Sequence, residues 1–206
     1  MKKLQEYHSA TVHHYAARTH LRRLAKTPGS ETLVENFEQV YAILLEKQKN
    51  LEEKIEVRID ANDDIDYYDT ILDNNVKMCS FEAKSYDVKS GTAPVYNLLF
   101  PEGGYSSITR MNKIEEVTEV EALAGRIENL GNEHPLFTFA ATLLALTTDS
   151  KKAIENFRQA EEEVNKATAE LEIAKSNLRE KYRDNYLQAC SKLGDNKAES
   201  LFTNSF

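Results

Sequence analysis

The sequence is poor in the residues that interrupt helices. Its 206 residues include only seven glycines and four prolines, and tryptophan is absent. Two long runs, 30–90 and 136–193, contain neither glycine nor proline. Because these two residue types are the strongest helix breakers, and because no segment alternates in polarity with a period of two, the sequence predicts an all-α fold without a sheet.

Cysteine is also scarce, and Cys79 and Cys190 lie too far apart in the sequence to indicate a disulfide framework. Both fall on apolar faces, so we expect buried thiols in a reducing compartment. The amino terminus lacks the apolar run of a secretory signal, and the longest apolar-rich window, 136–146, is too short to cross a bilayer. We therefore expect a cytoplasmic protein without a membrane span.

The sequence also has no overall positive charge. The formal net charge is −8 at pH 7, which argues against nucleic acid as a partner because phosphate contacts need clustered lysine and arginine. The segment 1–29 is an exception, with six basic residues and one acidic residue, and we expect it to meet an acidic surface. Its apolar residues are too sparse for insertion into a membrane surface.

Capping signals divide the two long runs. A straight helix of 60 residues would be about 90 Å long, so either run could fold back on itself. The Asp- and Asn-rich stretch 59–64 and the sequence TTDS at 147–150 are the expected breaks, because these residues favour N-caps and turns. The expected helices are 3–26, 31–59, 63–89, 113–130, 135–147 and 150–193, with short helical turns near 94–100 and 197–203.

Alanine returns at every seventh residue of the second long run, with a larger apolar residue between each pair. This four-three spacing is typical of a coiled-coil seam, in which small side chains let two helices approach closely. The residues of this alanine seam are Ala153, Phe157, Ala160, Val164, Ala167, Leu171, Ala174 and Leu178. Either the seam belongs to one helix of an antiparallel bundle, or it serves as an interaction surface for a second chain.

The two halves of the chain resemble each other weakly. The paired segments are ENFEQ at 35–39 with ENFRQ at 155–159, and DNNVKMCS at 73–80 with DNYLQACS at 184–191. The pairs occur in the same order, but they need gaps, and helical sequences rich in Glu, Lys and Ala resemble one another by chance. Two interpretations of these pairs therefore stay open: chance similarity, or an internal duplication with pseudo-repeats 5–111 and 125–206.

No catalytic or metal-binding pattern is complete in this sequence. The five histidines lack the one-turn spacing that two metal ligands on a helix need. The acidic stretch 60–73 begins like a calcium loop but has Ile65 and Ile71 where glycine and glutamate are required. We interpret it as the first part of a helix, with weak cation binding or docking of a basic partner as alternatives.

The only Gly-Gly pair lies in a connector between two expected helices. It lacks the lysine and hydroxyl residue of a phosphate-binding loop, so the simplest interpretation is a turn in which Pro101 ends a helix and the glycines take positive φ. Loops on rigid helices often carry recognition. The candidate recognition loop comprises Phe100, Pro101, Glu102, Gly103, Gly104 and Tyr105.

These patterns predict one all-helical domain over residues 1–206, built as an elongated antiparallel bundle or coiled coil with two long helical runs. The expected function is that of a non-catalytic interaction or assembly protein that binds a protein partner or itself, without a cofactor. The alternative is a helical bundle that binds a ligand or a metal, or is an enzyme, through a dispersed site. Its candidate residues are Tyr67, Tyr68, His13 and His20.

Overall fold

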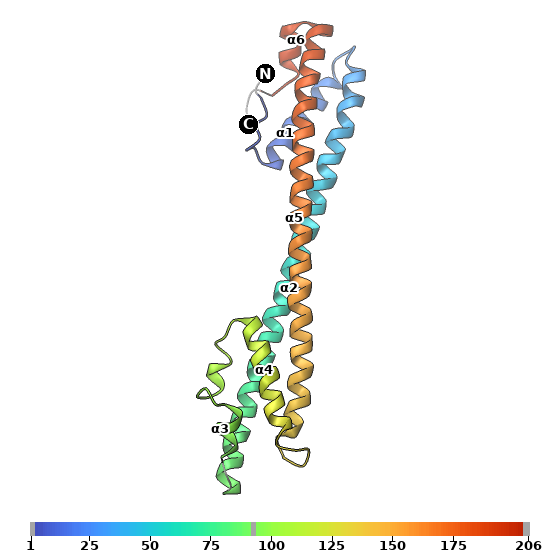
Figure 1. Cartoon of the computed structure of the whole chain (residues 1–206). Helices are drawn as coiled ribbons and strands as arrows, with labels where there is room; N and C mark the ends of the chain where they lie inside the picture. Colours follow the sequence, from blue (N-terminus) through green and yellow to red (C-terminus); the bar gives the residue numbers. More distant parts are fainter. Residues whose placement is uncertain (1–2, 92–93, 204–206) are drawn as a thin grey trace. The chain divides into compact units, whose positions relative to one another are not determined.

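The computed structural model describes residues 3–91 and 94–203, and every regular element in these ranges is a helix (Figure 1). The elements are α1 (Ala10–Leu24), α2 (Glu31–Ser90), α3 (Val95–Leu99), η1 (Tyr105–Ser107, a 3-10 turn), α4 (Lys113–Glu128), α5 (Phe137–Leu193) and α6 (Asp195–Ser200). The prediction of an all-α fold with two long helical runs is confirmed, and the two long helices pack against each other.

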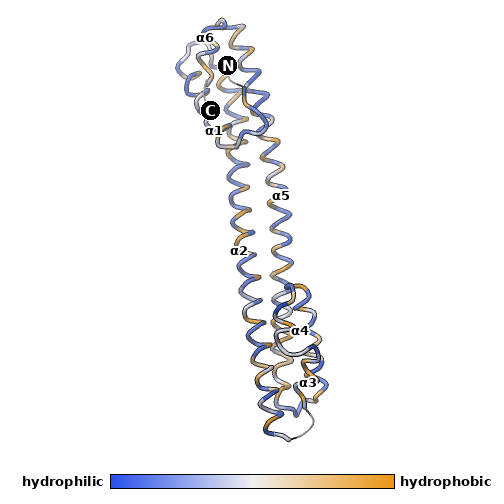
Figure 2. The backbone as a smooth tube through the Cα atoms, turned by 90° about the vertical axis from the view of Figure 1, so that its left-hand side faces the viewer, coloured by the Kyte–Doolittle hydropathy of each residue, from blue (hydrophilic) through white to orange (hydrophobic). Residues whose placement is uncertain are grey.

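The chain divides into two compact units. Unit 1 comprises Met1–Val57 and Glu161–Phe206, and unit 2 comprises Arg58–Ala160. Helices α2 and α5 contribute residues to both units, and Figure 2 shows apolar positions recurring among hydrophilic ones along both of them. The single domain over residues 1–206 and the internal duplication stay predictions.

The expected break at 59–64 is wrong, because α2 continues through it. Asn62, Asp63 and Asp64 are exposed, so their side chains can bind water instead of competing for backbone hydrogen bonds. Ala61 precedes them and is buried. The helix tolerates this polar stretch because the polar side chains stay on the side that faces solvent.

The expected break at 147–150 is also wrong, because α5 runs from Phe137 to Leu193. The hydroxyl groups of Thr147 and Thr148 both donate to the carbonyl oxygen of Leu144, at 3.0 and 2.8 Å. An N-cap would instead accept hydrogen bonds from the backbone N–H groups that follow it. These side chains therefore bond back to their own helix rather than starting a new one.

Unit 1 packs α1 and α6 against the parts of α2 and α5 that lie in this unit. Its largest buried side chains include Phe37 and Leu44 of α2 and Leu178 and Tyr182 of α5. The ion pairs Lys47–Glu170 (3.0 Å) and Lys54–Glu163 (3.4 Å) flank this core. Residue numbers rise along α2 as they fall along α5, so the two helices are antiparallel in this unit.

The first helix starts later than residue 3, where the sequence placed it. The Ser9 hydroxyl accepts a hydrogen bond from the Val12 N–H at 3.3 Å, which makes Ser9 the N-cap of α1.

Unit 2 packs α3 and α4 against its own parts of α2 and α5. The core contains Leu72 and Val76 of α2, Leu123 and Ile127 of α4, and Leu143 of α5. The segment 94–110 returns along this core, and side chains of the neighbouring helices hold both ends of α3.

The Asp87 carboxylate of α2 caps the start of α3 by accepting from the N–H groups of Val95 and Tyr96, at 2.7 and 2.9 Å. At the end of α3, Arg126 Nε donates to the Leu99 carbonyl oxygen at 2.9 Å. These hydrogen bonds satisfy backbone groups that so short a helix leaves without partners.

Candidate functional site

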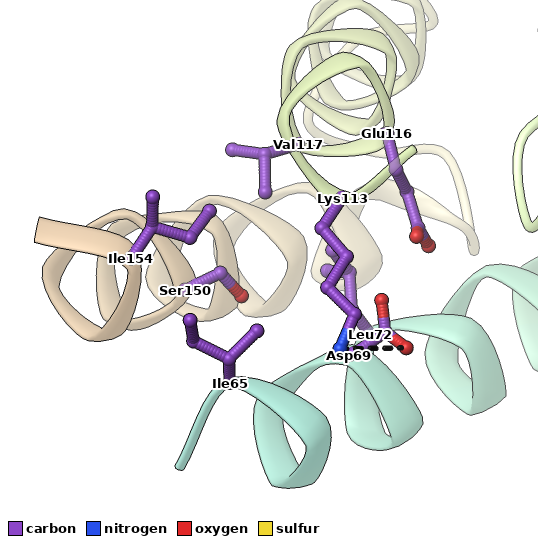
Figure 3. A pocket seen from close by; sticks show the side chains of 8 residues that line it. All are labelled: Ile65, Asp69, Leu72, Lys113, Glu116, Val117, Ser150 and Ile154. Carbon is purple, nitrogen blue, oxygen red and sulfur yellow. Dashed lines mark ion pairs between the residues drawn. The ribbon is translucent and has the colours of Figure 1, made fainter. Parts of the chain in front are cut away.

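Three carboxyl groups of unit 2 meet between α2 and α4. Asp69 and Asp73 are one turn apart on α2 and therefore share one side of that helix. Glu116 lies in the first turn of α4, and Figure 3 shows its side chain pointing towards α2. Glu116 is only 2% exposed and lies within hydrogen-bonding reach of both aspartates. We call these three residues the carboxyl cluster.

The carboxyl cluster holds a proton at neutral pH. Glu116 Oε1 and Asp73 Oδ1 are buried without an N–H or hydroxyl donor among the described residues, and two carboxylates can bond to each other only by sharing a proton. Burial is the largest cause that raises the pKa of Glu116, and Asp73 and Asp69 add to it, so that this pKa is about 8. A protonated Glu116 can donate to Asp73 and thereby avoid two adjacent buried charges.

Lys113 balances the more exposed side of the carboxyl cluster. Its ammonium group forms an ion pair with Asp66. It also lies 4.0 Å from Asp69 Oδ2, and this second pair is the dashed line in Figure 3. The cavity beside Lys113 and Glu116 is lined by Ile65, Leu72 and Ile154 and has room for about one water molecule. The arrangement can hold a proton and a water molecule.

Within residues 3–91 and 94–203, no three His, Cys, Asp or Glu side chains are arranged to hold a metal ion. Sequence reasoning missed the carboxyl cluster, because the approach of Glu116 to α2 depends on the packing of α4.

A second buried polar group lies in unit 1, where His20 of α1 is surrounded by rings. Its imidazole stacks on Phe202 with 4.1 Å between ring centroids and meets Phe37 and Tyr182 edge-on at 4.9 and 5.3 Å. Its Nδ1 lies 3.1 Å from the Leu201 carbonyl oxygen, and Asn185 Nδ2 lies 3.2 Å from its Nε2. We call His20, Phe37, Tyr182 and Phe202 the ring cluster.

The partners of His20 fix its neutral form. Nδ1 must carry the proton in order to donate to the Leu201 carbonyl oxygen, and Nε2 must be unprotonated in order to accept from the Asn185 amide. The same amide also donates to the Leu33 carbonyl oxygen at 3.1 Å. Burial is the main cause that lowers the pKa of His20 to about 4. His20 therefore ties α1, α2, α5 and the segment after α6 together as an uncharged group.

The residues suggested for a dispersed ligand site belong to two different units. His13 and His20 belong to unit 1, where His13 Nδ1 bonds to the Ser9 carbonyl oxygen at 2.9 Å and His20 bonds to Leu201. Tyr67 and Tyr68 belong to unit 2, and their rings pack edge to face with centroids 5.3 Å apart. Each of these side chains therefore already has its own neighbours.

The alanine seam is covered within the chain. Ala153 and Ala160 are buried in unit 2, and Ala167 and Ala174 are buried in unit 1. In unit 1 the seam residues Leu171, Ala174 and Leu178 share a core with residues of α2. Phe157 and Val164 are partly buried. The use of this seam by a second chain stays a prediction, and any such chain would have to contact more exposed side chains.

The candidate recognition loop combines buried and exposed residues. Phe100 is buried, Pro101, Glu102 and Gly103 are exposed, and Tyr105 is partly buried. Gly103 and Gly104 have φ values of +99° and +128°, as the sequence predicts. A Cβ atom on Gly104 would lie 2.9 Å from the Tyr96 hydroxyl oxygen, so the site requires glycine for two reasons.

A stripe of mainly apolar residues, interrupted by Asn74 and Ser85, faces away from the core of unit 2 on helix α2. Tyr67, Met78, Phe81 and Val88 are more than half exposed, and Val88 reaches 86%. The stripe consists of Tyr67, Ile71, Asn74, Met78, Phe81, Ser85 and Val88, and we call it the outer stripe. Its spacing alternates four and three residues, so its members share one side of the helix.

The outer stripe lies opposite the buried side of α2, which carries Leu72, Val76, Cys79 and Ala83. At its edge, the Phe81 ring meets Tyr105 of the candidate recognition loop, with centroids 6.0 Å apart. Sequence reasoning missed the outer stripe, although the four-three spacing from Tyr67 to Val88 could have shown it. The pattern of the buried residues on the same helix is stronger and was recognised instead.

A basic groove opens on unit 1 beside the ring cluster. Lys3, Arg179 and Arg183 line it together with Ser176 and Glu180, and its volume is about 330 Å³. The Nη1 atom of Arg179 is buried and has no hydrogen-bond partner among the described residues. The groove therefore offers more positive than negative charge to a small ligand.

Comparison of the chain with protein-family models, curated proteins and solved structures gives no match. In the part of the chain that the structure describes, no helix combines the length and the apolar composition that crossing a bilayer requires.

Proposed function

We propose that this protein is a non-catalytic interaction protein that presents the outer stripe of α2 to another protein helix. The observation that carries this proposal is that α2 has exposed apolar side chains opposite its buried side in unit 2, although the buried side is enough to attach it to its own core. Apolar side chains scattered singly on a surface need no explanation. A series at coiled-coil spacing matches the way in which amphipathic helices bind grooves and other helices.

The neighbouring features support binding rather than catalysis. The cavity at the carboxyl cluster has room for about one water molecule, and the ring cluster holds His20 in an uncharged, fully bonded form. The candidate recognition loop borders the outer stripe through the contact between Tyr105 and Phe81. A partner helix on the stripe would therefore also reach this loop.

The test compares a stripe variant with a matched surface variant. In Met78→Lys/Phe81→Glu two apolar side chains of the stripe become charged, whereas in Ile114→Lys an exposed apolar residue of α4 outside the stripe is changed. We expect sedimentation velocity and affinity purification to show association of the wild type and of Ile114→Lys but not of the stripe variant. Circular dichroism at 222 nm checks that all three proteins are folded.

The proposal fails if the wild-type protein is a strict monomer at high concentration and no protein is retained in stoichiometric amount. It also fails if Met78→Lys/Phe81→Glu retains the same association as the wild type.

Three finer properties belong to this proposal. The alanine seam acts as a coiled coil, supported by the flanking pairs Lys47–Glu170 and Lys54–Glu163. The protein works in the cytoplasm, supported by two free cysteines, of which Cys79 is buried and has a pKa raised by burial to about 12. The two long helices derive from an internal repeat, which is supported only by the paired sequence segments.

A second function, binding of a small anionic ligand, is favoured by the basic groove of unit 1. Lys3, Arg179 and Arg183 would supply charge, and the buried Nη1 of Arg179 lacks an acceptor among the described residues. Thermal-shift and calorimetric titrations with inorganic phosphate, citrate and ATP test this function. Arg179→Gln/Arg183→Gln should abolish any stabilisation, and elemental analysis of the purified protein tests the metal-binding alternative.

A further inference from the structure

We infer that the basic groove of unit 1 binds a small phosphate monoester, whose doubly charged phosphate group is held by Lys3, Arg179 and Arg183. This inference rests on the second function proposed above and names the chemistry of its ligand. It is independent of the outer stripe, which belongs to unit 2. Three properties of the groove carry it: the balance of charge, a guanidinium nitrogen without a partner, and the size and lining of the space.

Positive charge exceeds negative charge in the groove. Arg179 and Arg183 lie one turn apart on α5, and Ser176 lies almost one turn before Arg179, so these three residues share one side of the helix. Lys3 comes from the segment before α1, and Glu180 is the acidic exception. The excess of two positive charges matches a phosphate monoester, which carries about two negative charges near neutral pH.

The two arginines lack a close anionic partner within the described residues. Arg179 Nη1 is buried and accepts no hydrogen-bond partner there, and Arg183 has Asp184 at 4.0 Å, with both side chains at least half exposed. A buried donor without an acceptor costs free energy. Because the charge is delocalised over the whole guanidinium, an anion in the groove would stabilise Arg179 even though Nη1 is buried.

His13 of α1 senses the positive charge of this region. It is fully buried, and its Nε2 has no hydrogen-bond partner among the described residues. Burial is the main cause that lowers the pKa of His13, and the positive charges of Lys175, Arg179 and His8 lower it further. An anion bound at Arg179 would offset part of this field, so His13 can report on the occupancy of the groove.

The size and lining of the groove fit an organic phosphate better than a free phosphate ion. Its volume is about 330 Å³, near the lower limit of about 300 Å³ for small-molecule sites. Leu4 and Tyr182 add apolar side chains to the lining. A guanidinium fork and the Ser176 hydroxyl can bind phosphate oxygens, while the apolar side chains contact the organic part.

Calorimetry at constant ionic strength tests the ligand class with three probes: phenyl phosphate, inorganic phosphate and benzoate. We expect phenyl phosphate to bind most tightly and benzoate to bind at least about tenfold more weakly, because it carries one charge less. Arg179→Gln and Arg183→Gln should each weaken phenyl phosphate about tenfold or more. Arg22→Gln, an exposed position of α1 outside the groove lining, should leave its affinity unchanged.

Nuclear magnetic resonance of the imidazole groups tests the position of the bound anion. Saturation with phenyl phosphate should raise the pKa of His13 in the wild type, because the anion offsets the charge of Arg179. In Arg179→Gln this pKa should already be raised without ligand and should not respond further. His14, whose Nδ1 bonds to the Tyr41 hydroxyl at 3.0 Å, is the internal control.

The outcomes separate the inference from the function on which it rests. Benzoate or citrate that binds as tightly as phenyl phosphate would overturn the phosphate assignment and leave anion binding standing. Phenyl phosphate binding that is unchanged in Arg179→Gln would place the anion elsewhere and overturn the inference. No binding of any of these anions would overturn both. Retention on vesicles with phosphatidic acid, without binding of phenyl phosphate, would assign the phosphate to a lipid headgroup and overturn the soluble ligand.

Discussion

Glu116 of α4 and Asp73 of α2 each have a buried carboxyl oxygen, and the two groups can hydrogen-bond to each other only while they share a proton. The ammonium group of Lys113 lies with Asp66 and Asp69 on the more exposed side. Loss of the shared proton would therefore place two negative charges together where water cannot surround them.

Unit 2 should lose stability as the pH rises. The pKa of Glu116 is about 8 in the folded chain and 4.5 for a free glutamate, so its contribution is complete below about pH 4.5 and falls progressively until about pH 8. The full effect is roughly 3–5 kcal/mol. Hydrogen exchange of the α4 amides, corrected for the intrinsic rate, should show decreasing protection between about pH 5 and pH 8.5.

Glu116→Gln is the matched variant for this prediction, because an amide donates to Asp73 without a titrating proton. It should be as stable as the wild type near pH 5 and more stable at pH 8.5, while Glu115→Gln, on the exposed side of α4, should keep the wild-type profile. A wild-type profile that is flat across this range would contradict the shared proton.

Unit 1 should respond to pH in the opposite direction. The pKa of His20 is about 4 in the folded chain and 6.5 for a free imidazole, so its contribution is complete above about pH 6.5 and is lost as the pH falls to about 4. The loss is about 3 kcal/mol. Urea unfolding at pH 7 and pH 4.5 should show it in the wild type and in His14→Gln, whereas His20→Gln should keep only the part that comes from His13, whose pKa is also lowered by burial.

Nuclear magnetic resonance of the imidazole groups gives an independent check on His20. Its ring should remain neutral with the proton on Nδ1 down to about pH 4. A titration midpoint near 6.5 would mean that the ring cluster does not exclude water from His20.

Gly104→Ala should destabilise unit 2 more than Gly103→Ala does. Both changes place a side chain at positive φ, which costs roughly 1–2 kcal/mol. Only the Cβ at 104 meets another atom, the Tyr96 hydroxyl oxygen at 2.9 Å. Gly104→Ala should therefore have the lowest midpoint temperature of thermal unfolding. Adding Tyr96→Phe should recover part of the difference in midpoint between Gly104→Ala and Gly103→Ala.

The alanine seam should not tolerate larger side chains. Ala174 is buried where α5 meets the core of unit 1, so Ala174→Leu should lower the free energy of unfolding by about 1–3 kcal/mol. Ala169 is exposed on the same helix, and Ala169→Leu should change it by less than about 0.5 kcal/mol. Equal effects in urea unfolding would show that the seam is not packed within the chain.

The spacing of apolar residues was enough to predict the helical class and the burial of the alanines, because both follow from a repeat along one helix. The capping signals led to breaks being expected in α2 near Asn62 and in α5 near Thr147, and neither break occurs. Asp, Asn and Thr favour caps when a helix can end, but they are tolerated when buried residues on both sides keep the helix attached to its core.

The carboxyl cluster and the ring cluster lay beyond sequence reasoning for a different reason. Glu116 and Asp73 are 43 positions apart (116 − 73), and His20 and Phe202 come from opposite ends of the described chain. No local pattern relates such residues, and their chemistry arises only after the helices have packed. The outer stripe is the exception, because its spacing is visible in the sequence.

The division into units also has a consequence for synthesis on the ribosome. Unit 2 is one uninterrupted segment, whereas unit 1 needs residues from both sides of it, including Tyr182 and Phe202. Unit 2 can therefore fold before the residues after 160, which complete the core of unit 1, have been translated. Until then Leu33 and Phe37 remain uncovered, and this interval is when the nascent chain is most exposed to aggregation or to chaperones.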